Sequence, residues 1–292
     1  MRRADYGVRP DASGSFSKAE TLALYESICR SHFFDSQVID AVKSGLTNYQ
    51  VYLSLGQEAG PAALAAALPG AQLFTQHRCH GYFIAFGGPP EKLRDELLGR
   101  PSGSSGGRAG SNCLQHHDER LAMFGHHGLI GENVPLAVGA AFGNQKKTIA
   151  VFGDGSAEED YIYPSLGFAL THRLPILFVC EDNDLSILTP TSTRRSWEFT
   201  QMAKGLGLPV RDLADDPWSV VQAVRELKGE LPAVLNIRTC RRQWHVGVGC
   251  DGPPEWDRLA LVQAELDRLG LGAERQEIER QAQQEMERLW NE

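Results

Sequence analysis

Short runs of apolar residues, many of them β-branched, predict three buried strands at residues 148–152, 175–180 and 233–237. A helix-like segment at residues 161–171 separates the first two. Together they form a βαβ unit, whose right-handed crossover brings the polar segments that follow both strands to one edge of a parallel sheet. Polar residues also follow the third strand, so we expect its end at the same edge. The pattern predicts an α/β fold with a parallel sheet flanked by helices.

Helical periodicity accounts for much of the rest of the chain. Apolar residues recur at helical spacing over residues 18–44, and Ser17 with Glu20 forms a capping-box pattern at the start of this segment. An alanine-rich helix is expected at residues 59–68, and a charged amphipathic helical tail begins near residue 253. We expect these helices to pack on the sheet rather than to carry the chemistry.

The predicted organisation is a flexible arm, residues 1–16, followed by one domain, residues 17–292, that ends in the helical tail. A net charge of −8 argues against nucleic acid or an anionic membrane as a general partner. No apolar run is long enough to cross a membrane, and the first residues lack the apolar core of a signal peptide. The six cysteines are scattered without a C-x-x-C pair, which fits reduced thiols in a cytoplasm.

Polar residues with metal-binding chemistry follow the first two strands. Asp154 comes directly after the first, and Asn183 follows the second, 29 positions later. A carboxylate and an amide oxygen, with the backbone carbonyl of Leu185, are hard ligands that suit Mg²⁺. Such a metal keeps coordination places for phosphate oxygens, and the N–H groups of Gly155 and Ser156 lie near a helix start, where anions bind. The stretch predicts a magnesium–diphosphate site, with an ordinary turn as the alternative.

The glycine–aspartate–glycine sequence, with its asparagine at this spacing, resembles the thiamine-diphosphate motif. The wording of the whole segment, GDGSAEE to CEDN, is most similar to the α subunit of 2-oxo acid dehydrogenase E1 components. The resemblance extends over roughly residues 20–290. It implies the thiamine-diphosphate-binding fold, here only the diphosphate-binding half, with thiamine diphosphate and Mg²⁺ as cofactors. It also implies that Asp154, Asn183 and Leu185 bind the metal and that Gly155 and Ser156 bind the cofactor.

A second patch of candidate chemistry is dense in histidine. Arg78 suits bidentate phosphate binding, and the neighbouring imidazoles of His77 and His80 can donate to phosphate or shuttle protons; a solvated basic patch is the alternative. The resemblance assigns Arg78 to the diphosphate and His80 to catalysis near the cofactor, while His77 stands where the family has an aromatic residue. It also assigns His245 to the diphosphate and to proton transfer.

The resemblance places the backbone groups of Gly128 and Ile130 at the cofactor's aminopyrimidine ring. The glycine- and serine-rich segment 101–117 is expected to be a flexible surface loop. There Cys113 stands where the family has a histidine, so we assign no catalytic role in this loop. The polar segment 185–195 is expected to be a loop over the site, and its departure from the family's wording leaves the acyl acceptor open.

Thiamine chemistry needs a carboxylate beside the pyrimidine ring, which E1 components of this kind take from a separate β chain. The resemblance therefore implies an α₂β₂ heterotetramer in which this chain alone is inactive. We expect an α subunit that decarboxylates a pyruvate-like 2-oxo acid and transfers the acyl unit to an acceptor such as a lipoyl domain. Two alternatives stay open: a carboligase subunit that adds two carbons to a sugar or other carbonyl, and a non-catalytic scaffold.

Overall fold

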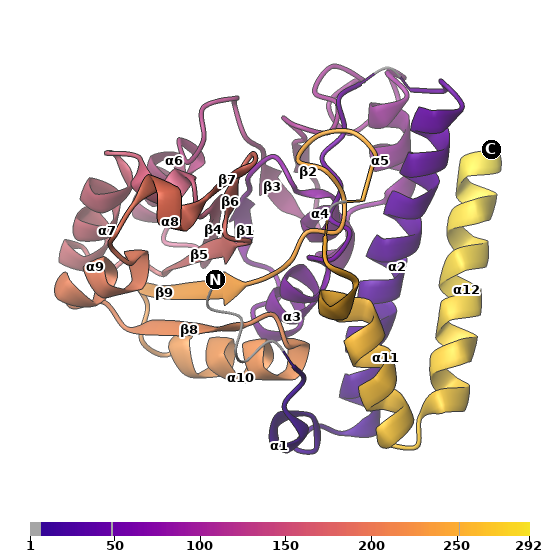
Figure 1. The fold of residues 1–292 in the computed structure, drawn as a ribbon. Helices are drawn as coiled ribbons and strands as arrows, with labels where there is room; N and C mark the ends of the chain where they lie inside the picture. Colours follow the sequence, from indigo (N-terminus) through magenta and orange to yellow (C-terminus); the bar gives the residue numbers. More distant parts are fainter. Residues whose placement is uncertain (1–6, 48, 251) are drawn as a thin grey trace.

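A computed structural model describes residues 7–47, 49–250 and 252–292. Its centre is a seven-stranded sheet in the order β2-β3-β1-β4-β5-β9-β8, parallel except for the antiparallel pair of β2 and β3 (Figure 1). The predicted parallel sheet flanked by helices is confirmed. The strands are β1 Gln72–Phe74, β2 His116–His117, β3 Ala122–Phe124, β4 Thr148–Gly153, β5 Ile176–Asp182, β8 Val210–Ala214 and β9 Ala233–Arg238, with a separate hairpin of β6 Leu185–Ser186 and β7 Thr189–Pro190.

Helices cover both faces of the sheet, as Figure 1 shows. They are α1 Pro10–Ser13, α2 Lys18–Lys43, α3 Ala59–Ala67, α4 His80–Ala85, α5 Pro90–Leu97, α6 Asn133–Asn144, α7 Ile162–Thr171, α8 Thr191–Arg194, α9 Phe199–Gly205, α10 Pro217–Leu227, α11 Arg258–Arg268 and α12 Gly272–Asn291, with 3₁₀ turns η1 Ser156–Glu158 and η2 Pro254–Trp256. In the described residues no helix is both long and apolar enough to span a bilayer.

Alternating side chains of the central strands build two separate cores. Ile149 and Val151 of β4 pack with α2, α3, α10 and α12, whereas Ala150 and Phe152 pack with α6, α7 and α9 on the other face. Both faces of a parallel sheet are buried in this way, because successive side chains of a strand point to opposite faces. This burial explains why β4, β5 and β9 are mostly apolar in the sequence, without the alternation of a half-exposed strand.

The predicted βαβ unit is present. Strands β4 and β5 pair in parallel from Thr148 opposite Ile176 to Gly153 opposite Glu181, and β9 pairs with the other side of β5. The polar ends of all three strands therefore lie at one edge of the sheet. The capping box at the start of α2 is also confirmed, since the Ser17 hydroxyl accepts from the Glu20 N–H and the Glu20 carboxylate accepts from the Ser17 N–H.

The predicted flexible arm, residues 1–16, lies in part outside the described residues. Its described part differs from the expectation, because Pro10–Ser13 form a short helix that packs against α10. The Ser13 side chain is buried and donates to Glu265, and the Arg9 N–H donates to Asp216 at 3.3 Å. These partners lie more than two hundred positions away, so local sequence gives no sign of them.

The glycine- and serine-rich segment 101–117 is also more structured than its composition suggests. The carboxylate of Glu96, at the end of α5, is fully buried beneath it. It accepts hydrogen bonds of 2.6–3.1 Å from the backbone N–H groups of Ser105, Gly107, Ala109 and Gly110. Gly107 has φ of +72°, and a Cβ there would lie 2.5 Å from the Gly99 backbone, so glycine is required. The loop is thus folded around one buried acid.

Candidate active site

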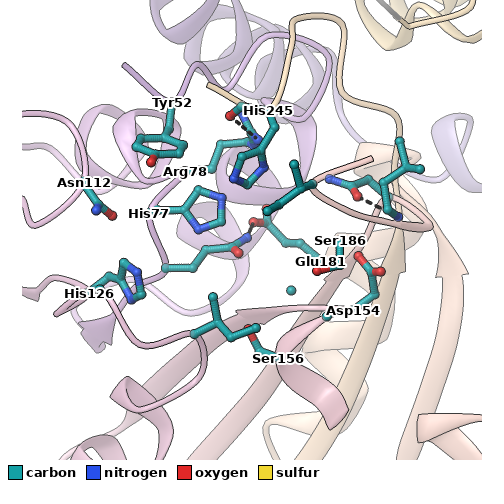
Figure 2. Close-up of a pocket in the computed structure, with 18 residues that line it drawn as sticks. Tyr52, His77, Arg78, Asn112, His126, Asp154, Ser156, Glu181, Ser186 and His245 are labelled. Carbon is teal, nitrogen blue, oxygen red and sulfur yellow. Dashed lines mark hydrogen bonds between the residues drawn. The ribbon is translucent and has the colours of Figure 1, made fainter. Parts of the chain in front are cut away.

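A cavity opens at the carboxyl ends of β1, β4 and β5, where the polar segments meet (Figure 2). Open parallel sheets commonly bind ligands at this edge. All the residues predicted to bind cofactor or metal line it: His77, Arg78, Gly128, Ile130, Asp154, Gly155, Ser156, Asn183, Leu185 and His245. The structure therefore brings together residues from five separate stretches of the chain. Cys113 does not line this cavity and lies in a separate surface groove beside His116.

His80 is the exception among the predicted site residues. It is fully buried and does not line the cavity. Its Nδ1 lies 2.7 Å from an Asp35 oxygen, and its Nε2 lies 2.8 Å from the Ser111 hydroxyl, which accepts from the Tyr52 N–H at 2.9 Å. Tyr52 does line the cavity. His80 therefore reaches the cavity only through Ser111 and Tyr52. Its catalytic role stays a prediction.

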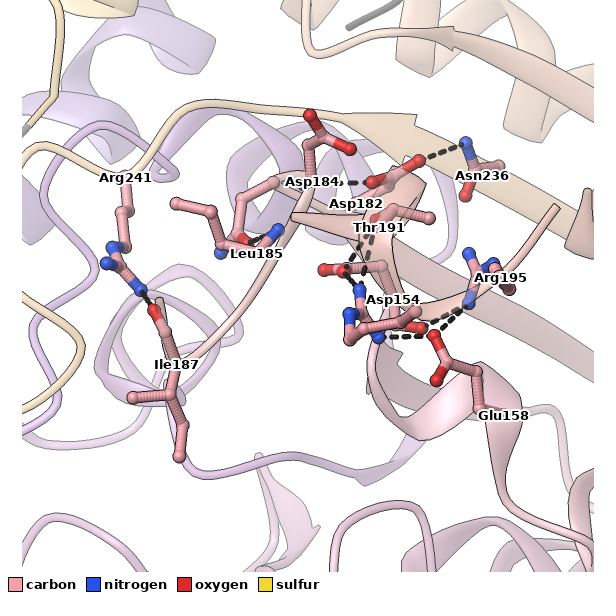
Figure 3. Close-up of polar contacts among 12 residues, drawn as sticks. Asp154, Glu158, Asp182, Asp184, Leu185, Ile187, Thr191, Arg195, Asn236 and Arg241 are labelled. Carbon is pink, nitrogen blue, oxygen red and sulfur yellow. Dashed lines mark hydrogen bonds and ion pairs between the residues drawn. The ribbon is translucent and has the colours of Figure 1, made fainter. Parts of the chain in front are cut away.

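Asp154, a predicted metal ligand, contacts the polar segment that follows β5 (Figure 3). Its carboxylate forms an ion pair with Arg194 and accepts from the Thr191 hydroxyl at 3.2 Å. Its backbone carbonyl accepts from Arg195 at 2.7 Å. Burial and, next, the nearby Asp182 raise the pKa of Asp154 to about 6. The buried Asp154 carboxylate is stabilised by a neighbouring positive charge, and in this structure the Arg194 guanidinium supplies it.

The other two predicted metal ligands lie beside it. The Asn183 side-chain oxygen accepts from the Leu185 N–H at 3.1 Å, and its amide group donates to Gln57 at 3.2 Å. In the described residues no group of three or more histidine, cysteine or acidic side chains has the geometry of a metal site. The predicted set holds one carboxylate, one amide and one backbone carbonyl, so it depends on phosphate oxygens or water to complete a Mg²⁺ site.

The residues predicted to bind the anion are the Gly155–Ser156 backbone and Arg78. Gly155 lets the chain approach the hairpin closely, because a Cβ there would lie 2.8 Å from the Ser186 hydroxyl oxygen. Ser156 begins the 3₁₀ turn η1, whose first N–H groups are available to an anion. Arg78 is buried and donates to the carbonyl of Leu53 at 2.6 Å and to that of His245 at 3.3 Å. Arg78 lines the cavity and gives it a positive charge, which suits an anion such as a diphosphate.

Imidazole and phenol rings form one wall of the cavity (Figure 2). The His77 ring lies 4.8 Å from that of Tyr52, 5.2 Å from that of His245 and 5.9 Å from that of His126. Burial and, next, Arg78 lower the pKa of His245 to about 4, and burial also lowers the pKa values of His77 and His126. All three imidazoles are therefore neutral at pH 7.

Sequence reasoning missed several lining residues, including a buried acid. Glu181 accepts hydrogen bonds from Gln76 and, at 3.1 Å, from the Tyr82 hydroxyl. Burial raises the pKa of Glu181 to about 7. Gln76 and Glu181 both lie at strand ends, so the placement rule that found Asp154 was available for them. The missed lining residues are Tyr52, Gln76, Asn112, His126, Gly153, Glu181, Ser186 and Ile187.

Residues 29–251 match the dehydrogenase E1 component family. The chain belongs to this family. It is 29% identical over 248 residues to the α subunit of the pyruvate dehydrogenase E1 component of Rhizobium meliloti, covering 79% of this chain and 69% of that one. The corresponding subunit of Zymomonas mobilis is 31% identical, with 78% and 68% covered. The mitochondrial subunit of Saccharomyces cerevisiae is 30% identical, with 81% and 58% covered.

Membership of the E1 family confirms the resemblance to its α subunits that the motifs indicated, and it implies thiamine diphosphate as the cofactor. The cavity fits that group. Arg78 supplies a positive charge, the Gly155–Ser156 backbone supplies N–H groups, and Asp154 supplies a carboxylate, here paired with Arg194, of the kind that a metal ion binds. These are the three features that a metal-bound diphosphate requires.

Proposed function

We propose that this E1 chain is the α subunit of an enzyme that decarboxylates pyruvate or a related 2-oxo acid and passes the acyl unit to an acceptor. The observation that carries the proposal is one cavity, in an E1-family chain, lined by every residue predicted to bind cofactor or metal. The named relatives are pyruvate dehydrogenase E1 α subunits, which supports pyruvate as the substrate. A lipoyl domain is the acceptor that we propose. The comparisons do not favour the carboligase and scaffold alternatives.

The predicted site residues have distinct parts in this proposal. Thiamine diphosphate, when bound, supplies the electron sink that decarboxylation requires. Arg78 binds the diphosphate, and Asp154, Asn183 and the Leu185 carbonyl hold Mg²⁺ against it. The backbone groups of Gly128 and Ile130 border the aminopyrimidine ring. All of these residues line the same cavity.

The histidines hold or move protons at the diphosphate end. His245 is neutral at pH 7, so one ring nitrogen can donate while the other accepts. Its backbone carbonyl accepts from Arg78, which ties the loop after β9 to the phosphate-binding arginine. His77 packs between His245 and His126 and keeps the rings in place.

Arg194 should compete with Mg²⁺ for the Asp154 carboxylate. Replacement by glutamine, Arg194→Gln, is expected to raise the apparent affinity for Mg²⁺ and thiamine diphosphate about tenfold, since a charge-assisted hydrogen bond contributes roughly 1.5 kcal/mol. Calorimetric titration measures the affinity.

Tryptophan emission is a second readout of binding. Arg195 donates to the Asp154 carbonyl and stacks on Trp197, with its guanidinium carbon 4.9 Å from the ring centroid. Cofactor binding at Asp154 should therefore also change the tryptophan emission of the wild type.

The matched control is Arg173→Gln, which removes an exposed arginine that, unlike Arg194, forms no ion pair with Asp154. The Trp197→Phe variant should lose the emission change. An Arg194→Gln protein that binds the cofactor more weakly than wild type would show that this arginine assists binding and would contradict the competition.

A β subunit that carries the pyrimidine-binding domain is the proposed partner, in an α₂β₂ arrangement. Large apolar side chains are exposed on α6, on α7 and in the segment before α6: Leu129, Ile130, Leu136, Phe142 and Phe168. Ile130 also lines the cavity, so a partner seated on this surface would reach the cofactor. Exposed apolar groups of this kind are typical of protein interfaces. All six cysteines are free thiols, which supports a reducing compartment, and we propose the cytoplasm.

The isolated chain is expected to show no pyruvate decarboxylation, because the catalytic carboxylate for the pyrimidine comes from the partner. A tagged chain should be purified from its own cells, its companion identified by mass spectrometry, and pyruvate turnover measured with Mg²⁺ and thiamine diphosphate. Turnover by the pair and none by the single chain is the expected result. Appreciable turnover by the isolated chain would overturn the split site, and a pair without turnover would overturn the proposed function.

A further inference from the structure

Two buried polar atoms at one end of the cavity have no hydrogen-bond partner among the described residues. They are Oδ1 of Asn112 and Nδ1 of His126. Both residues line the cavity, and Figure 2 shows them on the side opposite Asp154. A buried polar atom left without a partner costs about 1–3 kcal/mol, so such atoms usually serve a ligand or a water molecule.

The surrounding structure holds both side chains in place. His126 is only 4% exposed, and its ring lies against that of His77. Asn112 follows Ser111, whose hydroxyl is bound by His80 and by the Tyr52 N–H. Glu96 anchors the backbone of the same loop at Ala109 and Gly110. The two orphaned atoms therefore belong to a built site rather than to a mobile surface.

The chemistry of these atoms selects the group that can satisfy them. The Asn112 Oδ1 only accepts a hydrogen bond, and the neutral ring of His126 presents either a donor or an acceptor at Nδ1, according to its tautomer. A carboxylate oxygen has no hydrogen to give Asn112, and an alkyl group leaves both atoms unpaired. A hydroxyl group donates to Asn112 and accepts from His126. A ligand hydroxyl can therefore replace a water molecule between them and satisfy both atoms.

We propose that Asn112 and His126 form a subsite for a hydroxyl group on the 2-oxo acid, so that a hydroxylated 2-oxo acid is preferred to an aliphatic one of equal size. The inference rests on the proposed function and specifies its substrate class. His77 supports the subsite by packing against His126 and by closing the wall toward His245. The sequence also indicates a more polar wall here, because His77 stands where the family has an aromatic residue.

Hydroxypyruvate and 2-oxobutanoate are a suitable pair of probes, because they differ by a hydroxyl in place of a methyl group. The copurified α/β enzyme, loaded with Mg²⁺ and thiamine diphosphate, is assayed with each probe and with pyruvate, using an artificial electron acceptor as the oxidant. The wild type is expected to favour hydroxypyruvate by at least about tenfold in kcat/KM, because the alkyl probe leaves two buried polar atoms unpaired. Asn112→Leu and His126→Phe should bring that ratio close to one.

His127→Phe is the matched control, since His127 is exposed and does not line the cavity, and its ratio should equal that of the wild type. Thermal upshift with Mg²⁺ and thiamine diphosphate is measured for every variant. A wild-type ratio near one, with pyruvate turned over, overturns the subsite and leaves the proposed function standing. Loss of the cofactor-induced upshift in Asn112→Leu or His126→Phe would assign these atoms to the cofactor and also overturn the inference. Absence of turnover with all three acids instead contradicts the proposed function.

Discussion

Asp154→Asn should weaken binding of Mg²⁺ and thiamine diphosphate to the α/β enzyme by at least about 100-fold and abolish turnover at ordinary cofactor concentrations. The reason is the loss of charge: Asp154 is the only carboxylate among the three proposed metal ligands, and an amide of equal size offers only a neutral oxygen. Even groups that merely support a metal ligand change affinity by about 10–100-fold. The loss of the ligand's own charge should exceed that effect.

The expected loss is measured by calorimetric titration of the purified pair, with Asp160→Asn as the control. Asp160 is exposed and does not line the cavity, so the same chemical change there should leave the affinity at the wild-type value. The fold should survive in Asp154→Asn, because Arg194 keeps its ion pair with Glu158. Melting without cofactor therefore separates lost binding from lost structure. Wild-type affinity in Asp154→Asn would remove this residue from the metal site.

Short-range patterns explain why much of the fold was predictable. Strands buried on both faces are rich in apolar residues on both sides, so β4, β5 and β9 stand out in the sequence. The handedness of the crossover then places Asp154 and Asn183 at one edge without any knowledge of tertiary contacts. The same logic applies to Arg78, which comes soon after β1 in the same sheet. Asp154 and Asn183 were thus found from local sequence and one topological rule, whereas Arg78 was found from its residue type and the family resemblance.

Contacts between distant segments explain what was not predictable. His80 lies two positions from Arg78, yet it begins a helix and turns away from the cavity toward Asp35 on α2. Composition described segment 101–117 as a loop, but only the structure reveals the buried acid that folds it. Arg194 follows a polar segment with no clear period, and its ion pair with Asp154 joins residues 40 positions apart. No local pattern encodes these pairings.

Glu96→Ala is expected to have the largest effect on stability, lowering the free energy of unfolding by about 3 kcal/mol. Removal of one partner from a buried charged network costs about 3–5 kcal/mol, and here four backbone N–H groups would lose their acceptor. Relaxation of the loop toward water should recover part of that cost. Because the loop carries Ser111 and Asn112, its rearrangement should also loosen the Asp35–His80–Ser111 network beneath the cavity.

Urea unfolding followed by circular dichroism measures the change, and Glu91→Ala is the matched control. Glu91 is an exposed glutamate on the same helix, so its replacement should shift stability by less than about 0.5 kcal/mol. Glu96→Gln keeps the volume and one acceptor oxygen and should lie between the two. Limited proteolysis supplies a second readout, since cleavage within residues 101–113 should appear first in Glu96→Ala. Equal stability of Glu96→Ala and Glu91→Ala would mean that the loop folds without its buried acid. It would then contradict the idea that Glu96 helps to position Asn112.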